Sequence, residues 1–323
     1  MRASIVLACI CAILAGHFAG GTPAAAFPDR SLRLVVPYPP GGGTDIVARA
    51  VGQKLAEAWK QNVVIDNRGG ASGNIGTELV ARATPDGYTL LIVISAFTVN
   101  PSIFKQLPWD PVRDFAPVSK VGSSAYVLVV HPGVPARSVS QLIALARAEP
   151  NALSFASSGI GSPLHLAGEL LKTRANINMV HVPYKGAGPA IVDLLAGRVQ
   201  VLFGSSVTML PHIRNGRLRA LATTSAKRVP AAPEIPTMAE AGVSDSEVDG
   251  WYGILAPAGT PPDRVRKLSD QIAAIMRTPE MRERFAKEGR EAMGTTPEEF
   301  SRFIAAEIAK WAKVVSATGI KVE

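Results

Sequence analysis

The chain reads LVVPYPPGGGTD at residues 34–45. Its first three residues predict the end of a buried strand, its prolines stop that strand, and three glycines lead into an amphipathic helix. The first N–H groups of a helix have no partner within the helix, and glycines leave no side chains in the way of a ligand. The stretch therefore predicts a loop whose backbone amides can bind a small anion.

The same order of strand, glycine loop and helix recurs at residues 157–163 and 182–189. Ser162 suits an N-cap and Pro163 a first helical position, while Pro189 suits the start of the later helix. Because ligands of parallel α/β sheets bind beyond the carboxyl ends of the strands, we expect the three loops to face one cleft. The alternative is that their glycines and prolines only shape tight turns.

The first 26 residues have the three parts of a secretory signal, namely Arg2, a short apolar stretch and small residues that end at Ala26. We predict export and cleavage after Ala26. Both cysteines, Cys9 and Cys11, lie in this segment, so that removing 26 of the 323 residues leaves 297 without a thiol. The packed core must then stabilise the exported protein without disulfides. Later apolar stretches are too short to span a membrane.

The formal net charge of +8 is spread along the chain, and only 6% of the residues are aromatic. A nucleic-acid surface needs a basic stripe with stacking aromatic side chains, so we expect no nucleic-acid partner. A mild positive field favours anionic solutes instead. The sequence predicts a monomer that binds a small, carboxylated solute.

Short β-rich runs alternate with amphipathic helices, which is the pattern of an α/β fold with mixed, mainly parallel sheets. The expected strands are 32–36, 63–66, 88–94, 153–156, 179–182, 199–203, 218–224 and 251–256, and the expected helices are 45–60, 75–83, 139–148, 163–174, 189–196, 262–276, 279–288 and 297–316. Residues 115–130 form a long extended stretch, which we expect to be broken at residues 122–124.

That long stretch suits a crossover between two lobes. We assign residues 27–122 and 223–323 to lobe 1 and residues 123–222 to lobe 2, with the strand at 218–224 leading back to lobe 1. Two connections between lobes permit hinge closure over a ligand, whereas a single linker would join independent units.

The candidate ligand-binding residues are those of the three loops, together with serines that follow two other strands. They are Tyr38, Gly41, Gly42, Gly43, Thr44, Asp45, Ser95, Ser157, Ser158, Gly161, Ser162, His165, Tyr184, Lys185, Gly186 and Ser205. Their amides and hydroxyls can donate to carboxylate oxygens, and each charge-assisted hydrogen bond contributes about 1.5–3 kcal/mol.

Two charged residues in these loops have alternative roles. Asp45 would repel an anion, so we expect it mainly to cap its helix while Arg49, four residues on, neutralises it. Contact with a ligand amine or a bridging water is the alternative for Asp45. Lys185 either pairs with the anion or is solvated.

His165 and Glu169 have the spacing of two metal ligands, but a third is missing. We therefore expect no metal site, and we expect His165 to brace its loop as a hydrogen-bond donor. Ser95 and Ser205 either line the cleft or only end a strand and begin a helix.

The sequence gives little support to an enzyme. It has no G-x-S-x-G elbow, no phosphate loop and no dinucleotide fingerprint, and glycines 41–43 alone are a weak nucleotide signal. We expect no cofactor and no catalytic residue. A Ser–His–Asp triad assembled from distant positions would make an exported hydrolase, and this alternative stays open.

An ordered set of motifs is similar to one family. Residues 37–45 (PYPPGGGTD), 67–76 (NRGGASGNIG) and 85–91 (PDGYTLL) resemble signatures of the Bug-type proteins, the solute receptors of tripartite tricarboxylate transporters. Further matches follow in the same order at residues 157–166, 184–190 and 256–261. The resemblance covers nearly the whole chain after residue 26.

The resemblance implies a periplasmic binding protein of type II, with two α/β lobes that close like a flytrap. Its members bind tricarboxylates, dicarboxylates, acidic amino acids and aromatic acids. By that pattern, residues 38–45 and ordered waters hold one carboxylate, while residues 157–165 and 184–188 close over it and set specificity. The implied partners are membrane permease subunits.

Two positions depart from the family pattern. Gly69 stands where proline is usual, and Gly204–Ser205 follow Phe203 where an acidic residue is frequent. The second departure favours a plain organic acid, dicarboxylate or aromatic acid over an amino acid. We expect a non-catalytic receptor that delivers this solute to a transporter, and the alternative from another class is a ligand sensor for a signalling partner.

Overall fold

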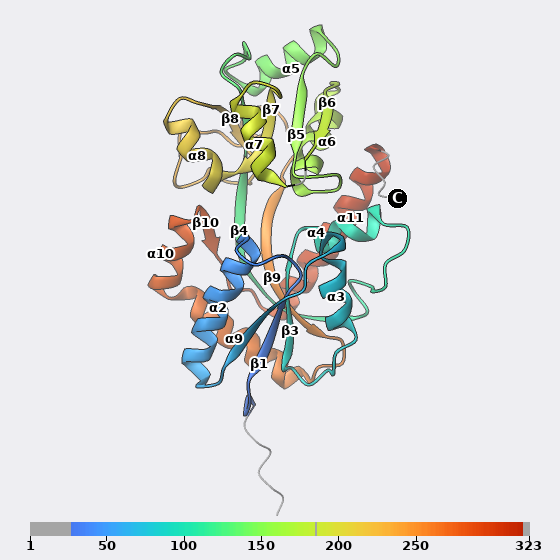
Figure 1. The fold of residues 1–323 in the computed structure, drawn as a ribbon, viewed down its shortest axis with the longest axis vertical. Helices are drawn as coiled ribbons and strands as arrows, with labels where there is room; N and C mark the ends of the chain where they lie inside the picture. The colour runs from blue at the N-terminus through green and yellow to red at the C-terminus, as the bar shows by residue number, and fades with distance from the viewer. Residues whose placement is uncertain (1–26, 185, 319–323) are drawn as a thin grey trace, which may run out of the picture.

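The computed structural model describes residues 27–184 and 186–318 of the chain (Figure 1). The predicted signal peptide, residues 1–26, and Lys185 lie outside the described residues. None of the described helices is both long and apolar enough to cross a membrane.

The lower part in Figure 1 is built by the two ends of the chain, and the upper part by its middle. The first end contributes β1 (Leu32–Val36), α2 (Gly43–Trp59), β2 (Val63–Asn67), the short helix η1 (Ala71–Gly73), α3 (Asn74–Ala81), β3 (Thr89–Ile94) and α4 (Ala96–Ile103). The middle contributes α5 (Val139–Ala148), β5 (Ser154–Ser157), α6 (Pro163–Ala175), β6 (Val180–Pro183), α7 (Ala187–Leu195), β7 (Val201–Ser205), α8 (Ser206–Arg214) and β8 (Arg219–Thr223). The last part of the chain forms α9 (Pro262–Arg277), α10 (Pro279–Lys287), β10 (Arg290–Ala292) and α11 (Pro297–Thr318).

Two long strands, β4 (Phe115–Val130) and β9 (Asp249–Pro257), run between the lower and the upper part (Figure 1). The strand order is β2-β1-β3-β9-β4-β7-β5-β6, with β8 and β10 also pairing with β4. The neighbours β1/β2, β1/β3, β5/β6 and β5/β7 are parallel, and every antiparallel pair among the described strands involves β4 or β9. The α/β fold with mixed sheets is therefore confirmed.

The expected break of the long strand at residues 122–124 is wrong, because β4 is continuous. Gly122 serves close packing instead. A Cβ at this position would lie 2.8 Å from the Phe285 ring of α10 and 3.0 Å from the Glu291 carbonyl oxygen of β10. The glycine thus lets α10 and β10 approach the strand.

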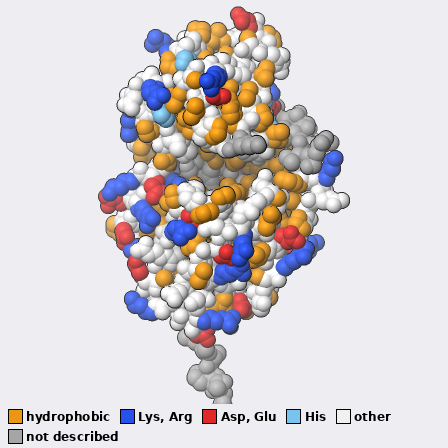
Figure 2. Space-filling model, in the orientation of Figure 1, with side chains coloured by type: hydrophobic (Ala, Val, Ile, Leu, Met, Phe, Trp, Pro, Cys, Tyr) orange, Lys and Arg blue, Asp and Glu red, His pale blue; other side chains and the backbone are white. Residues whose placement is uncertain are grey.

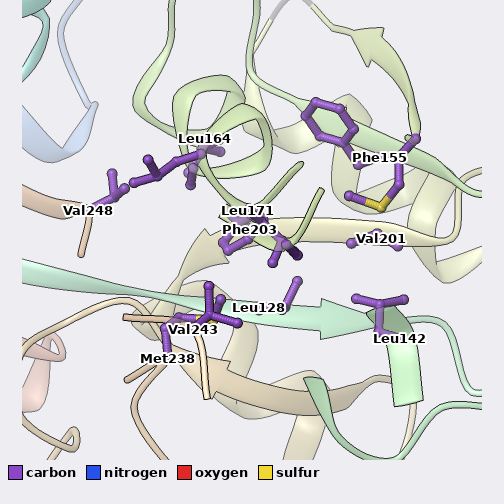
Figure 3. Close-up of a cluster of buried hydrophobic side chains, with 14 of the residues drawn as sticks. Leu128, Leu142, Phe155, Leu164, Leu171, Val201, Phe203, Met238, Val243 and Val248 are labelled. Carbon is purple, nitrogen blue, oxygen red and sulfur yellow. The ribbon is translucent and has the colours of Figure 1, made fainter. Parts of the chain in front are cut away.

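The upper core, which is the larger of two apolar clusters in the described upper part, gathers side chains from β4, β5, β7, α5 and α6 (Figure 3). Met238, Val243 and Val248 pack in the same cluster as Leu128 and Phe203. The strand β8 pairs with residues 127–130 of β4. This packing keeps residues up to 248 with the upper part and favours a return through β9 rather than at residue 223.

Two helices of the lower part also reach the upper core. Val99 and Ile103 of α4 belong to it, and so do Trp311 and Val315 near the end of α11. The beginning of α11 packs elsewhere, since Phe300 and Ile304 belong to a cluster of the lower part. Helix α11 therefore packs against both parts, beside the strands that cross between them.

Two buried charged side chains and one partly buried carboxylate lie where β4, β9 and α11 meet. Lys120 of β4 and Glu307 of α11 are each 9% exposed, and Lys120 Nζ lies 3.9 Å from the centroid of the Phe303 ring. Asp249 of β9 has a buried Oδ1 that lacks a hydrogen-bond partner among the described residues. Burial raises the pKa of Asp249 to about 6, against the opposing effect of Lys120.

The close approach of α11 to β9 can be tested at Gly253. A Cβ on this residue would lie 2.1 Å from Phe300 Cζ, and Phe300 is fully buried. We expect Gly253→Ala to lower the free energy of unfolding by about 2–3 kcal/mol in denaturant titrations, because the ring has no room to move. Gly188→Ala is the control, since its Cβ meets nothing within 4 Å. Equal stability of both variants would contradict this packing.

The partly buried Asp249 predicts a specific pH dependence. Its folded-state pKa of about 6 lies above the model value of 3.8, so the folded state keeps the proton longer than the unfolded state does. The stability that the protonated form contributes is complete below pH 3.8 and is lost as the pH rises to about 6, with a slope of at most about 1.4 kcal/mol per pH unit.

Asp249→Asn removes this titration while keeping the shape of the side chain. The difference in free energy of unfolding between Asp249→Asn and the wild type should therefore move in favour of the variant between pH 4 and pH 6.5. Chemical denaturation at pH 4, 5, 6 and 7 measures it. A difference that does not change with pH would show that folding leaves the pKa of Asp249 unchanged, and would contradict the raised pKa.

Candidate functional site

A cleft of about 600 Å³ lies between the lower and upper parts. Figure 2 shows the corresponding hollow across the middle of one face. The lower part contributes the first glycine loop and the end of β3, and the crossing strands β4 and β9 lie between the two parts. The lining residues from the lower part are Tyr38, Pro39, Pro40, Gly42, Gly43, Thr44, Ile94 and Ser95, those from the crossing strands are Ser124, Tyr126, Gly250, Trp251 and Tyr252, and those from the upper part are Ser158, Pro163, Leu164, Ala187, Ile191, Leu202, Gly204, Ser205 and Thr208.

Five helices begin at this cleft. The lining includes Gly43 of α2, Ser95 before α4, Pro163 of α6, Ala187 of α7 and Ser205 before α8. The N-cap side chains of α2, α4, α7 and α8 accept no hydrogen bond from the N–H groups of their helices. In α2 the first hydrogen bond within the helix is the one that Ile46 N donates to the Gly42 carbonyl oxygen. Helix N-termini carry partial positive charge and unused N–H donors. The cleft therefore has a positive potential from backbone groups alone.

Among the described residues, the lining of the cleft contains no charged side chain. Its polar groups are hydroxyls of serine, threonine and tyrosine. Of the site residues expected from the sequence, seven line the cleft: Tyr38, Gly42, Gly43, Thr44, Ser95, Ser158 and Ser205. The other described ones do not line it, and Lys185 lies outside the described residues.

Asp45 holds the first loop in shape. Its carboxylate accepts hydrogen bonds from Gly41 N at 2.9 Å, Arg49 Nε at 2.9 Å and Asn67 Nδ2 at 3.0 Å. The bond from Arg49, followed by the one from Gly41, keeps the pKa of Asp45 near 2 against the effect of burial. The expected pairing with Arg49 is confirmed, and the carboxylate is satisfied by protein groups. Gly41 has a φ of +82°, which suits glycine at this turn.

The second loop is braced by two stacked histidines. His165 and His181 have ring centroids 3.8 Å apart and an interplanar angle of 12°. Gly161 N donates to His165 Nδ1 at 3.1 Å, and Ser157 Oγ lies 2.7 Å from His181 Nε2. His165 thus accepts the loop's hydrogen bond, whereas the sequence suggested that it would donate one.

Both histidines are neutral at physiological pH. Burial lowers the pKa of His165 to about 3 and that of His181 to about 4. Ser157 is fully buried, so its hydroxyl cannot reach a substrate in the cleft, although it contacts a histidine. The predicted N-cap is confirmed, since Ser162 Oγ accepts from His165 N at 3.3 Å. No group of three metal-ligating side chains occurs in the described part of the chain.

The third loop is fixed from both sides. Tyr184 donates its hydroxyl to Asp193 Oδ2 at 2.8 Å, on α7, and Gly186 N donates to the Ser158 carbonyl oxygen at 3.2 Å. Helix α7 begins at Ala187 rather than at Pro189. Proline is tolerated there because the N–H groups of the first turn have no helical partner in any case.

Two further tyrosines line the cleft, and no sequence pattern marked them. Tyr126 and Tyr252 come from β4 and β9, and Tyr126 pairs with the Ser95 side chain. Burial raises the pKa of Tyr38 and that of Tyr126, so that both hydroxyls stay protonated. They lie in extended stretches without a glycine motif. The one feature that could have marked them is a tyrosine hydroxyl beside the apolar residues of each strand.

A second hollow of about 790 Å³ lies beside α5 and β8. Both signs of charge line it, through Arg137, Arg219, Glu234 and Glu240. The Arg219 guanidinium donates to the carbonyl oxygens of Pro132, Val134 and Ala136. That guanidinium is occupied by the protein itself, whereas the cleft between the two parts offers unused helix N–H groups. The smaller cleft is therefore the better candidate site.

The chain was compared with protein families and known proteins. The model of the tripartite tricarboxylate transporter family receptors (TctC) matches residues 47–320. BugT of Bordetella pertussis is 40% identical over 315 residues, which cover 96% of this chain and 96% of that protein.

Two solved structures from Rhodopseudomonas palustris have the same fold. Rpa4515 with adipate is 38% identical, with a TM-score of 0.81, and covers 91% of this chain and 99% of its own. MatC with bound malate is 30% identical, with a TM-score of 0.77, and covers 90% and 100%. The resemblance drawn from the motifs is thereby confirmed, and the chain belongs to the tripartite tricarboxylate transporter receptor family, among its Bug-type proteins.

Proposed function

We propose that this protein is a periplasmic receptor that captures a small carboxylate in the cleft and delivers it, unchanged, to the permease subunits of a tripartite transporter. One observation carries the proposal: five helices begin at a cleft whose described lining residues are uncharged. Backbone N–H groups and hydroxyls suit a carboxylate, which accepts several hydrogen bonds at once. Adipate and malate in the two similar structures support the same class of ligand.

We assign one carboxylate of the ligand to the first loop, where the backbone amides of Gly42, Gly43 and Thr44 can donate hydrogen bonds to it. The hydroxyls of Tyr38 and Ser95 are further donors on the same side. Ser158 and Ser205 on the upper part would then close over the ligand. In this assignment Asp45 and His165 shape the loops and do not touch the ligand.

Closure requires two units that move about a hinge. We assign residues 27–122 to lobe 1 and residues 123–222 to lobe 2, as proposed from the sequence, and place residues 223–248 with lobe 2 because their apolar side chains pack there. The remainder returns to lobe 1 through β9. Helix α11 accompanies the hinge, since it packs against both clusters.

The family supports a periplasmic location and a role with membrane permeases, and both enter here as proposals for this chain. A non-catalytic role is supported by the buried Ser157, which has no access to the cleft. We further propose that the receptor acts as a monomer.

A thermal-shift screen tests the ligand class. Adipate, malate and benzoate are compared with glucose and with the uncharged diamide of adipic acid. A ligand at 100 times its Kd stabilises a protein by about 2.7 kcal/mol, which raises the melting temperature by several degrees. We expect a shift with at least one acid and none with the neutral compounds, and recovery of the acid unchanged. A shift with glucose alone would refute the proposal.

Gly42 tests the position of the carboxylate. A Cβ on Gly42 meets only the Pro39 carbonyl oxygen, at 3.7 Å, so the fold can accept a side chain there. Gly42→Val should reduce affinity for the acid found in the screen by about 100-fold or more, because the side chain fills the space beside the first amides of α2. Isothermal titration calorimetry measures the loss.

Ala305→Val is the control, since Ala305 is exposed on α11 and does not line the cleft. It should bind the acid as the wild type does. If Gly42→Val is folded and keeps its affinity, the first loop does not hold the ligand.

A further inference from the structure

The side chain of Arg290 leaves β10 on the side of the sheet that faces the cleft. In β10 it lies opposite Ser124 of β4, and Ser124 in turn lies opposite Gly250 of β9. Residues directly opposite each other in antiparallel strands have their side chains on the same face. Ser124 and Gly250 both line the cleft. The register therefore directs the Arg290 side chain toward the same side.

The guanidinium of Arg290 lies against the first loop and the floor of the cleft. Its Nη2 is 3.1 Å from the position that a Cβ on Gly43 would occupy, and the Tyr252 hydroxyl is 3.2 Å from that same position. The guanidinium carbon is 5.3 Å from the centroid of the Tyr252 ring. Gly43 and Tyr252 are lining residues, so the cation lies at the wall of the cleft beside the start of α2.

The charge of Arg290 is buried and incompletely paired. The side chain is 9% exposed, and its Nη1 donates to Glu288 Oε2. Its Nε is buried without a hydrogen-bond partner among the described residues. A buried donor without a partner and a buried cation both cost free energy. The positive end of helix α2 raises that cost further.

An anion at the start of α2 would relieve these costs together. It would offset the helix dipole and the guanidinium with one negative charge, without any charged side chain having to line the cleft. Glu288 offsets the cation only in part, because it lies 3.8 Å from Arg284 Nε as well and is itself 29% exposed. The protein therefore keeps net positive charge under the first loop.

We propose that Arg290 is the charge-selecting residue of the cleft. From its place beside Gly43 and Tyr252, its guanidinium supplies the positive charge that makes the start of α2 accept a carboxylate and reject the isosteric neutral amide. Arg290 is a positioning residue that acts across the wall of the site. This inference rests on the proposed function, and it names the group that sets the charge preference of that site.

The test compares Arg290→Gln with the wild type by calorimetric titration of adipate, malate, benzoate and the diamide of adipic acid. For an acid that the wild type binds, we expect a loss of about 10- to 100-fold in Arg290→Gln, the usual worth of a charge-assisted contact. Arg290→Lys, which keeps the charge, should recover part of the loss. Raising the salt concentration should weaken acid binding in the wild type more than in Arg290→Gln.

Arg282→Gln is the matched control, because Arg282 is exposed on α10 and belongs neither to the cleft lining nor to the ion pairs of Glu288. It should bind acids as the wild type does. Melting temperatures without ligand show whether Arg290→Gln is folded. If it is unfolded, the acid affinity of Arg290→Lys and the salt dependence of acid binding to the wild type test the inference instead.

The outcomes separate this inference from the proposed function. If the wild type binds an acid while Arg290→Gln binds it equally well, or with the same dependence on salt, the inference is wrong and the proposed function stands. If the affinities of Arg290→Gln for the acid and for the diamide fall by the same factor, Arg290 has only a structural role and the inference is again wrong. If the wild type binds none of the acids, both fail.

Discussion

The antiparallel pair of β4 and β9 is the constraint on which the rest of this molecule depends. Its register runs from Phe115 opposite Pro257 to Ala125 opposite Asp249, with bulges near Ser119 and Gly122. Beyond Ala125, β4 continues into the upper part and pairs with β7 and β8. One strand thus belongs to the hydrogen-bonded sheets of both parts, and β9 returns along it. Every parallel βα unit on either side is attached to this pair.

Because both parts extend from one strand pair, the carboxyl ends of their parallel strands face each other. Each such end leads through a loop into a helix, and this geometry brings five helix N-termini to one cleft. Within the loops, some side chains fix the backbone and others leave its N–H groups open to the cleft. Asp45 and His165 accept hydrogen bonds from loop N–H groups, and Tyr184 anchors its loop to α7 through Asp193, so that the remaining N–H groups stay free and correctly placed.

Sequence patterns predicted the fold because each βα unit is local: strand, turn and helix lie within about 30 residues. A helix start at Ser95 and Ser205 was one of two alternatives, and no extent was predicted for α4 or α8. Each contains an internal proline, Pro101 or Pro211, which masks the helical pattern. The continuity of β4 was also missed. Gly122 has the local appearance of a break, and only the approach of Phe285 from α10 explains it.

The candidate site was half predictable for the same reason. Glycine loops mark where a backbone can approach a ligand, so Gly42, Gly43 and Thr44 were found at the cleft. What no local pattern can show is which groups distant strands bring beside them. Tyr126 and Tyr252 line the cleft, and Arg290 lies beside Gly43, through the registers of β4, β9 and β10. These registers are set by pairings between segments more than 100 residues apart.

A site made of helix ends from two lobes also explains how a tightly held anion can be released. In the proposed role, the starts of α2 and α4 lie on one lobe and those of α6, α7 and α8 on the other. Hinge opening would withdraw three of the five positive ends at once, without breaking an ion pair with a lining side chain. The positive charge of Arg290 would stay with the first lobe, where it would hold the carboxylate until the second lobe had moved away. Capture and release would then differ mainly in the number of helix ends that surround the ligand, and the position of the hinge would set its affinity.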